Sequence, residues 1–425
     1  MREIEDHPLR YKLASELHAR PFPALRAPAA GAFVALKHRG DAGEGREAAT
    51  DHLIALLDRL GTAHPAPGAT HHSVEIGRHF VKWECHSEFV TYTVIEAGRE
   101  GAAFDPSVLD VLPQDWLARA PGPRITSALL SLEIREGQDT LLAALAERFV
   151  PESLAVSEVL DGSAVIASDF RIDGAGHVRI SLFLDAGCGA RRTGRIVQRL
   201  TEIETYKAMS MIGLYRARSL TADMERIEAA LGRITDTMAA GDRGPDRILA
   251  DLLPLAAELE NLVAASSYRF GATAAYAAIV AERVRVLREE RVAHRQTFHE
   301  FMTRRYDPAM RTVVATQRRL SEMSSRALRV SDLLRTRVDV ERSAQNQALL
   351  ASMDRRAEAQ LQLQKTVEGL SIVAISYYAV NLAAYLLAPA AEAAGVGKTA
   401  LLAGLVPLVV LLVWMMVRRV RRALD

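Results

Sequence analysis

The chain has 425 residues, and its 53 Lys and Arg residues nearly balance its 52 Asp and Glu residues. This length is enough for two or three domains and a sizeable core. The even balance provides no overall field that would draw the protein to nucleic acid, so no nucleic-acid partner is expected. The two cysteines, Cys85 and Cys188, lack C-x-x-C spacing, which excludes a disulfide framework and suits a reducing compartment.

Residues 1–188 are predicted to form an α+β or α/β domain. Short apolar or alternating runs between turn residues predict strands. These runs lie at 31–39, 72–98, 125–136, 153–160, 163–172 and 177–184. The DGAG stretch at 173–176 predicts a hairpin turn between the last two. Helical patterns at 47–60 and 139–149 alternate with the strands, so a layered domain of sheet and helices is expected.

From residue 189 to 366 the apolar period is helical, and a domain of long helices is predicted. Apolar residues from Leu220 to Met238 recur at alternating steps of four and three, which is typical of a coiled coil or a long antiparallel helix pair. After the turn AAGDRGPDR, further helices are expected at 248–265, with a kink at Pro254, and at 268–302.

The last of these helices begins near Pro308 and meets no Gly or Pro before Gly369. If it continues to about Leu387, it is about 120 Å long at a rise of 1.5 Å per residue. Apolar residues recur along its first part at heptad-like steps. They are Leu320, Met323, Ala327, Val330 and Leu334. Because an isolated helix of this length is not stable in water, it must pack on the preceding helices or on copies of itself. A homo-oligomer is therefore expected.

Two long apolar runs follow, at 367–388 and 399–417, and a short segment at 389–398 joins them. About 20 helical residues span the roughly 30 Å hydrocarbon core of a bilayer. Two membrane-spanning helices in contact with lipid are therefore predicted. The alternative, a pair of buried core helices, is disfavoured because such helices rarely have so long a fully apolar run.

Basic residues set the expected orientation of these spans. The tail at 418–425 carries four arginines, whereas the joining segment carries only Glu392 and Lys398 as charged residues. The four arginines are Arg418, Arg419, Arg421 and Arg422. Positive charge stays on the cytoplasmic side, so the C-terminus is expected inside, and two crossings place residues 1–366 there too. The opening MREIEDHPLR shows no pattern of a secretory signal.

Three stretches resemble an uncharacterised family of bacterial proteins that are predicted to be membrane-anchored. They are HPLRYKLASELHARPF, YRFGATAAYAAIVAERVRVLREER and LQKTVEGLSIVAISYYAVNL. The resemblance covers essentially the whole chain, but the family brings no established activity. Together with the charge pattern, it implies a protein of the bacterial inner (plasma) membrane with two spans and both termini in the cytoplasm.

The order of elements resembles that of the CorA-type divalent-cation channels, which are pentamers. Their signature is a Gly-Met-Asn motif after a Tyr at the outer end of the first span. Here Tyr378 and Asn381 match the Tyr and the Asn, but Ala379 and Val380 replace the Gly and the Met, and further apolar residues follow. The resemblance implies a divalent cation as partner and a pore-lining role for Tyr378 and Asn381. Alternatively, Asn381 forms a hydrogen bond to a neighbouring helix.

Other patterns were weighed as sites. The GVGKT stretch at 395–399 lacks the first Gly of a phosphate-binding loop. The DAGCGARRTGR stretch at 185–195 suits an anion through Arg191, Arg192 and Arg195 at a helix start, or else forms a hinge. A group of His and Cys side chains suggests a metal, although strand alternation separates His72 from His79. The members of this group are His71, His72, His79, Cys85 and His86.

No H-E-x-x-H or G-x-S-x-G motif occurs in the chain. No cofactor and no catalytic residue are therefore predicted. The sequence predicts a membrane-anchored, cytoplasm-facing oligomeric scaffold or sensor of unknown ligand. A CorA-like divalent-cation channel is one alternative, and an enzyme with an unrecognised site in the sheet-containing domain is another.

Overall fold

A computed structural model describes residues 4, 6–17, 22–40, 42–99, 101–394 and 397–424. Two compact units are present. The first comprises residues 1–242 and 250–330, and the second comprises residues 243–249 and 331–425. Each is described by itself below, and the domain boundaries expected at 188 and 366 stay predictions.

The first unit contains one nine-stranded sheet among its described residues. Its strands in chain order are β1 (Ala29–Lys37), β2 (His71–Ile76), β3 (His79–Cys85), β4 (Phe89–Ala97), β5 (Arg124–Ile134), β6 (Ala155–Val159), β7 (Ala164–Ile172), β8 (Val178–Leu184) and β9 (Glu290–Arg291). The spatial order is β2-β3-β4-β1-β5-β8-β7-β6-β9. All the pairings are antiparallel except that of β5 with β8. The prediction of a mixed sheet-and-helix domain is confirmed.

Residue alternation explains how the sheet is covered on both faces. Along β5, Leu130 and Leu132 join one core cluster, whereas Leu129 joins another on the opposite face. The predicted hairpin turn after β7 is also confirmed, because the backbone N–H of Asp173 donates to the carbonyl of His177 at 2.8 Å. The sheet therefore has two apolar faces, and each must be covered by helices.

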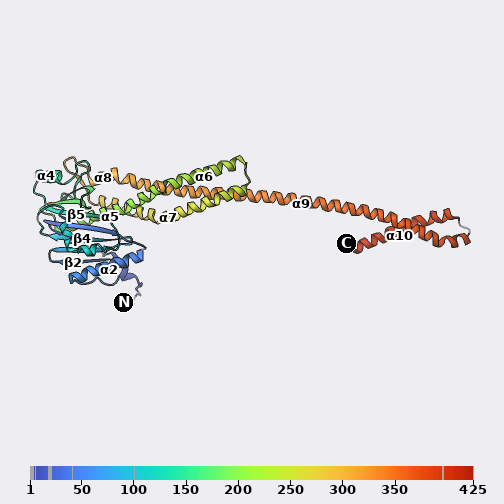
Figure 1. The fold of residues 1–425 in the computed structure, drawn as a ribbon, viewed down its shortest axis with the longest axis horizontal. Coiled ribbons are helices and arrows are strands. Elements are labelled where there is room, and N and C mark those ends of the chain that lie inside the picture. The colour runs from blue at the N-terminus through green and yellow to red at the C-terminus, as the bar shows by residue number, and fades with distance from the viewer. Residues whose placement is uncertain are drawn as a thin grey trace. The chain divides into compact units, whose positions relative to one another are not determined.

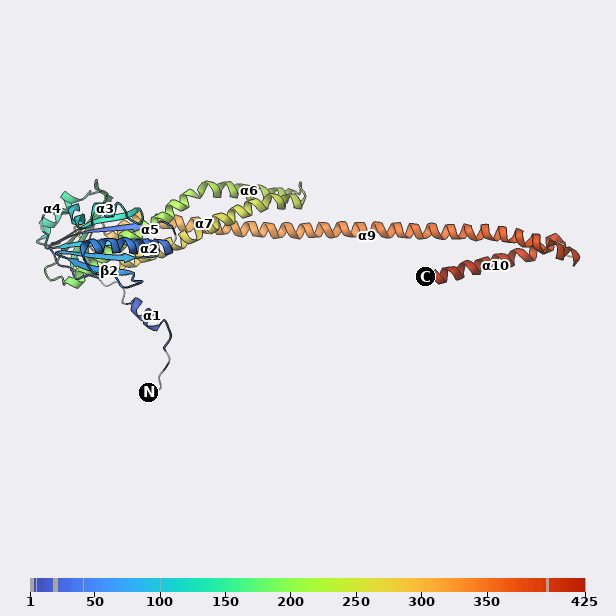
Figure 2. The same cartoon turned by 60° about the horizontal axis from the view of Figure 1, so that its bottom comes forward.

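Two groups of helices cover these faces. On one side are α2 (Ala42–Leu60), the 3₁₀ turn η1 (Pro106–Val111), α3 (Gln114–Leu117) and α4 (Gln138–Arg148). On the other side are α5 (Ala190–Ser219), the end of α7 (Pro245–Arg285) and α8 (Phe298–Arg305). Figure 2 shows α2 lying along the strands. A short helix, α1 (Arg10–Leu17), precedes the sheet in sequence.

The long helices of the first unit pack through the apolar residues that the heptad-like pattern singled out. α6 (Thr221–Ala240) and α7 lie side by side in Figures 1 and 2. Most of the patterned residues of α6 and of α9 (Asp307–Ala393) are at most 9% exposed, and Met238 is partly exposed. The buried ones include Met224, Ile227, Leu231, Ile234, Leu320, Met323, Ala327 and Val330. Arg319 Nε also donates to Glu228 at 3.0 Å, so α9 contacts α6. Formation of a coiled coil stays a prediction.

The prediction of separate helices at 248–265 and 268–302 is wrong. α7 is one helix from Pro245 to Arg285 that includes Pro254, and β9 and then α8 follow it. Arg288 and His294 have positive φ angles of 48° and 60°, which no α-helix contains. A capping box of Thr297 and Glu300 starts α8. The T-x-x-E spacing at 297–300 is the sequence pattern that predicts a new helix start here.

The second unit contains the apolar part of the chain. α9 has 87 residues and continues through Pro389 to Ala393, beyond the expected end at 388, because the segment after Pro389 is rich in Ala, a strong helix former. α10 (Lys398–Leu424) lies beside the end of α9 (Figure 1). Both helices are long and apolar enough to cross a membrane, and only 11% of each apolar window is buried. A core helix of a soluble protein would be mostly buried.

Candidate functional site

A cavity of about 440 Å³ lies where β5 and β8 end and α4 begins. We call it the edge cavity. Several separate segments line it, namely 28–30, residue 99 with 101–104, 131–137 and one face of α4, together with Phe183. The α4 residues are Thr140, Leu141, Ala144 and Arg148, which recur at helical spacing. In open sheets, ligands bind outside the carboxyl ends of strands, which is where this cavity opens.

Charged groups in the edge cavity are held in defined positions. The Arg148 guanidinium donates two hydrogen bonds to the Glu133 carboxylate, at 2.6 and 3.2 Å. It also lies over the Phe183 ring, 5.7 Å from the ring centroid. Ser131 donates to Glu133 from the same strand. A bidentate arginine pair of this kind is geometrically specific and leaves the arginine little freedom to rotate.

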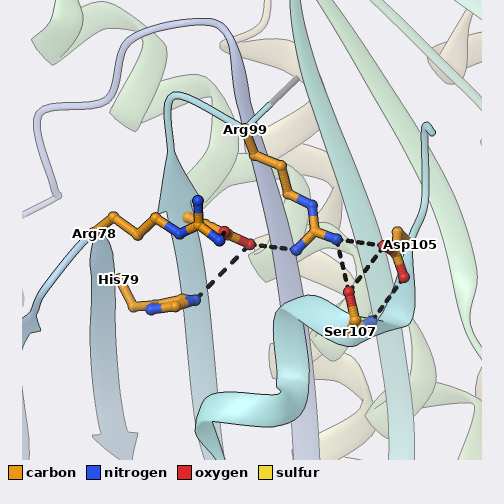
Figure 3. A network of polar contacts seen from close by, with 6 residues as sticks. Arg78, His79, Arg99, Asp105 and Ser107 are labelled. Atoms are coloured by element: carbon orange, nitrogen blue, oxygen red, sulfur yellow. Dashed lines mark hydrogen bonds and ion pairs between the residues drawn. The ribbon is translucent and has the colours of Figure 1, made fainter. Parts of the chain in front are cut away.

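Arg99 connects the edge cavity to a buried carboxylate. Figure 3 shows Arg99 reaching toward Asp105 and Ser107. The Arg99 guanidinium also donates to the Glu96 carboxylate. Glu96 is only 1% exposed and also pairs with Arg78 at 2.6 Å. A buried carboxylate needs such cations because burial without a partner costs several kcal/mol.

The local structure explains this arrangement. Glu96 lies opposite His79 in the β3–β4 register, and the His79 Nε2 atom is 3.8 Å from the carboxylate. Gly98, with φ of 69°, then turns the chain so that Arg99 follows directly. Asp105 caps η1 by accepting from the Ser107 backbone N–H at 3.0 Å, and this bond lowers the pKa of Asp105. Hydrogen bonding to Glu96 raises the pKa of Arg99.

The edge cavity suits the binding of a small polar molecule. It offers guanidinium groups from Arg99, Arg135 and Arg148, the carboxylates of Glu133 and Glu136, and apolar walls. This mixture of a few placed charges and apolar surface is typical of ligand pockets of 300–1,000 Å³. Its described lining residues include the hydroxyl groups of Ser131 and Thr140 but no His and no Cys.

The residues that the sequence singled out in the apolar helices lie elsewhere, in the second unit. Asn381 Nδ2 donates to the carbonyl of Tyr377, one turn earlier in α9, at 3.0 Å. Tyr378 is 73% exposed. The Arg418 guanidinium lies over the Trp414 ring, 5.0 Å from the centroid. Interhelical, pore-lining and topology-setting roles for these residues stay predictions.

Several singled-out positions fall outside what the structure describes. Residues 395 and 396 of the GVGKT stretch are among them, as are the side chains of Arg421 and Arg422. Within the described part of the chain, no group of three or more His, Cys, Asp or Glu side chains is placed to hold a metal ion. His72 lies opposite Trp83 in the β2–β3 register, and Cys85 is buried.

The fold defines a mixed-sheet unit with a charged cavity at one edge, in a chain that also contains a hairpin of apolar helices. Residues 5–424 match a family described as protein of unknown function (DUF3422). The chain belongs to this family, and the expectation of an uncharacterised family that spans the chain is confirmed. Comparison with curated proteins and with solved structures gave no significant match.

Proposed function

We propose that this protein is a membrane-anchored, oligomeric sensor or scaffold of the bacterial inner membrane that faces the cytoplasm. The supporting observation is that α9 and α10 carry apolar segments of membrane-spanning length of which only 11% is buried within the chain. Lipid would cover this surface, because exposure of so much apolar area to water is unfavourable. Arg418 and Arg419 follow the second segment, which supports a cytoplasmic C-terminus.

The edge cavity supports a sensor in preference to a purely mechanical anchor. Arg148 and Glu133 lie in the cavity wall as a pre-positioned ion pair, and Arg99 is fixed by Glu96 and Asp105. Pre-positioned polar groups lower the entropic cost of binding a ligand. The ligand that suits these groups is a small molecule with both charged and apolar parts.

Filling the cavity tests this function. Ala144 lines the edge cavity and is partly buried, whereas the neighbouring Ala143 on α4 is exposed and does not line it. After incubation with cytoplasmic extract, native mass spectrometry of the detergent-solubilised protein should show a bound small molecule. The A144W variant should lose it and A143W should retain it. An unliganded wild-type protein, or equal loss in both variants, would contradict the proposal.

The CorA-like channel is the second candidate, and the continuity of α9 favours it. One unbroken helix runs from Asp307 through the apolar segment that holds Tyr378 and Asn381. In liposomes loaded with a Mg²⁺-sensitive dye, the sensor proposal predicts no more Mg²⁺ or Co²⁺ entry than in protein-free liposomes. Entry that Asn381→Ala abolishes would instead establish the channel.

A further inference from the structure

Five arginine side chains gather around a second cavity, of about 360 Å³, in the first unit. We call it the arginine cavity. Arg192, Arg195 and Arg199 come from the first three turns of α5. Arg285 is the last residue of α7, and Arg288 follows it. Leu160 and Val286 complete the lining. The described lining therefore contains no acidic residue.

The fold holds these arginines together. The three on α5 are spaced at i, i+3 and i+7, which places them on one face of the helix. Arg199 Nη1 donates to the carbonyl of Val286 at 3.0 Å, so α5 and the end of α7 are directly joined. A Cβ atom on Gly194 would lie 1.7 Å from the Pro23 carbonyl oxygen, so the start of α5 is closely packed. This packing favours an anion site over a hinge.

The positive charge of the cavity is only partly compensated. Arg285 pairs with Glu282 at 2.7 Å, and Arg288 pairs with Asp161 at 2.8 Å. Among the described residues, the three arginines of α5 have no carboxylate partner. Arg192 donates to Ser163 Oγ at 2.7 Å, and Arg195 lies over the Phe22 ring at 5.5 Å. Three guanidinium groups that form no ion pair within the described part of the chain therefore line one cavity.

The positive charge around the cavity affects the pKa of Arg199. Burial lowers the pKa of Arg199, and the positive charges of Arg195 and Arg283 lower it further. The carboxylate of Glu202 opposes this lowering of the pKa of Arg199, but it is also bonded to Arg283. Arg199 is partly buried, whereas Arg192 and Arg195 are exposed. Placing like charges around a partly buried cation is unfavourable unless an anion neutralises them. The hydrogen bond to the carbonyl of Val286 gives Arg199 a role in capping the C-terminal end of α7. Arg192 and Arg195 have no such capping role.

We propose that the arginine cavity binds a soluble polyphosphate anion, such as inorganic pyrophosphate or the phosphate chain of a nucleotide. Planar guanidinium groups that approach from two helices suit tetrahedral phosphoryl groups, which accept paired hydrogen bonds. A phosphoryl group carries about 1.5 to 2 negative charges near pH 7. Two linked groups are therefore the smallest number that matches three arginines that form no ion pair within the described part of the chain. The volume lies at the small end of the range for ligand pockets.

Calorimetric titration with sodium pyrophosphate tests this proposal on the full-length protein in nanodiscs of zwitterionic lipid. The R192Q/R195Q variant lacks two guanidinium groups. Its affinity for pyrophosphate should be about 100-fold lower or more, because each hydrogen bond to a charged group raises the affinity at least about tenfold. The matched control is R191Q. Arg191 is exposed on the same helix turn, as Arg192 and Arg195 are, but it does not line the cavity. Its substitution should leave the affinity within about threefold of wild type.

Three results would overturn the proposal. One is the absence of heat from the wild-type protein at millimolar pyrophosphate. Another is equal weakening in R191Q and R192Q/R195Q, which would show non-specific attraction to a basic surface. The third is loss of pyrophosphate binding in nanodiscs that contain anionic phospholipid, which would assign the cavity to a lipid headgroup. Retention of binding in those nanodiscs supports a soluble ligand. Unchanged thermal unfolding of R192Q/R195Q would show that the variant is folded.

Discussion

At the scale of single residues, the sheet unit depends on polar side chains that are buried with complete partners. Glu88 is 6% exposed, and its carboxylate accepts from Arg269 at 2.6 and 3.0 Å and from the Tyr276 hydroxyl at 3.0 Å. Arg269 and Tyr276 lie on α7, so this cluster ties the β3–β4 turn to a helix that is distant in sequence. Removing one partner would leave a charge buried and unpaired.

We predict that Arg269→Ala lowers the free energy of unfolding by about 3 to 5 kcal/mol, because Glu88 then stays buried without its counter-ion. Thermal unfolding in detergent measures the loss. The matched control is R226A, since Arg226 pairs with Glu258 on the exposed surface, and no measurable change is expected there. Equal effects of the two substitutions would show that the buried pair has no special role.

Buried histidines predict how stability depends on pH. His52 lies between the Tyr92 hydroxyl at 2.9 Å and the Trp116 carbonyl at 3.0 Å, and burial lowers its pKa. Burial also lowers the pKa of His38 and of His177. A folded-state pKa below the unfolded value of about 6.5 means that the unfolded chain binds more protons in acid. Stability is therefore complete above about pH 6.5 and falls as the pH falls below it.

We expect each such histidine to contribute a loss of up to about 1.4 kcal/mol per pH unit below pH 6.5. His52→Gln replaces the titrating ring by an amide that can bond to the same two partners. It should make the unfolding temperature less dependent on pH between 7 and 5. A pH profile as steep as that of the wild type would disprove this role of His52.

The residues of the edge cavity could not be predicted from the sequence, for a physical reason. Arg99, Glu133 and Arg148 come from segments that only the complete sheet brings together. The polar run of Arg135, Glu136 and Gly137 after a buried strand was the local signal, since ligands bind beyond the carboxyl ends of strands. In contrast, the arginines at the start of α5 were visible in sequence, but their partners after α7 were not.

At the scale of elements, the periodic pattern predicted the strands and the long helices well. Alternation located the strands because one face of each is buried, and the steps of three and four located Met224 and Leu320 in packed seams. The pattern failed between Arg285 and Thr297, where positive φ angles and a two-residue strand interrupt helix-compatible residues. Helix propensity alone cannot predict such a break, because tertiary pairing with β6 overrides it.

The middle of α9 leads to a prediction about assembly. Leu349, Leu350 and Met353 are 57 to 61% exposed in the single chain. A long helix with exposed apolar residues is stabilised in water by packing against a partner, and copies of itself are the partner that we propose. L350D/M353D should therefore lower the mass of the detergent-solubilised complex toward that of the 46.5 kDa chain.

The control for this prediction is A348D/S352D, which adds the same charge to the opposite side of the helix. Its complex should keep the wild-type mass in multi-angle light scattering. A monomeric wild-type protein, or an unchanged mass of L350D/M353D, would show that this part of α9 is not an interface.

At the scale of the whole molecule, two apolar segments of membrane-spanning length follow a sheet unit that contains a charged cavity. Hydropathy predicts such segments well, because a bilayer demands an uninterrupted apolar helix. It contains no information about what the sheet unit binds, which depends on tertiary contacts. We propose that the apolar segments anchor the protein with the sheet unit on the cytoplasmic side.

Trypsin treatment of oriented membrane vesicles tests this claim most directly, with an antibody against the sheet unit as readout. The protein should remain in the membrane pellet after alkaline carbonate washing. The sheet unit should be digested in inside-out vesicles and protected in right-side-out vesicles. Digestion in right-side-out vesicles, or recovery of the full-length chain in the carbonate supernatant, would contradict the account.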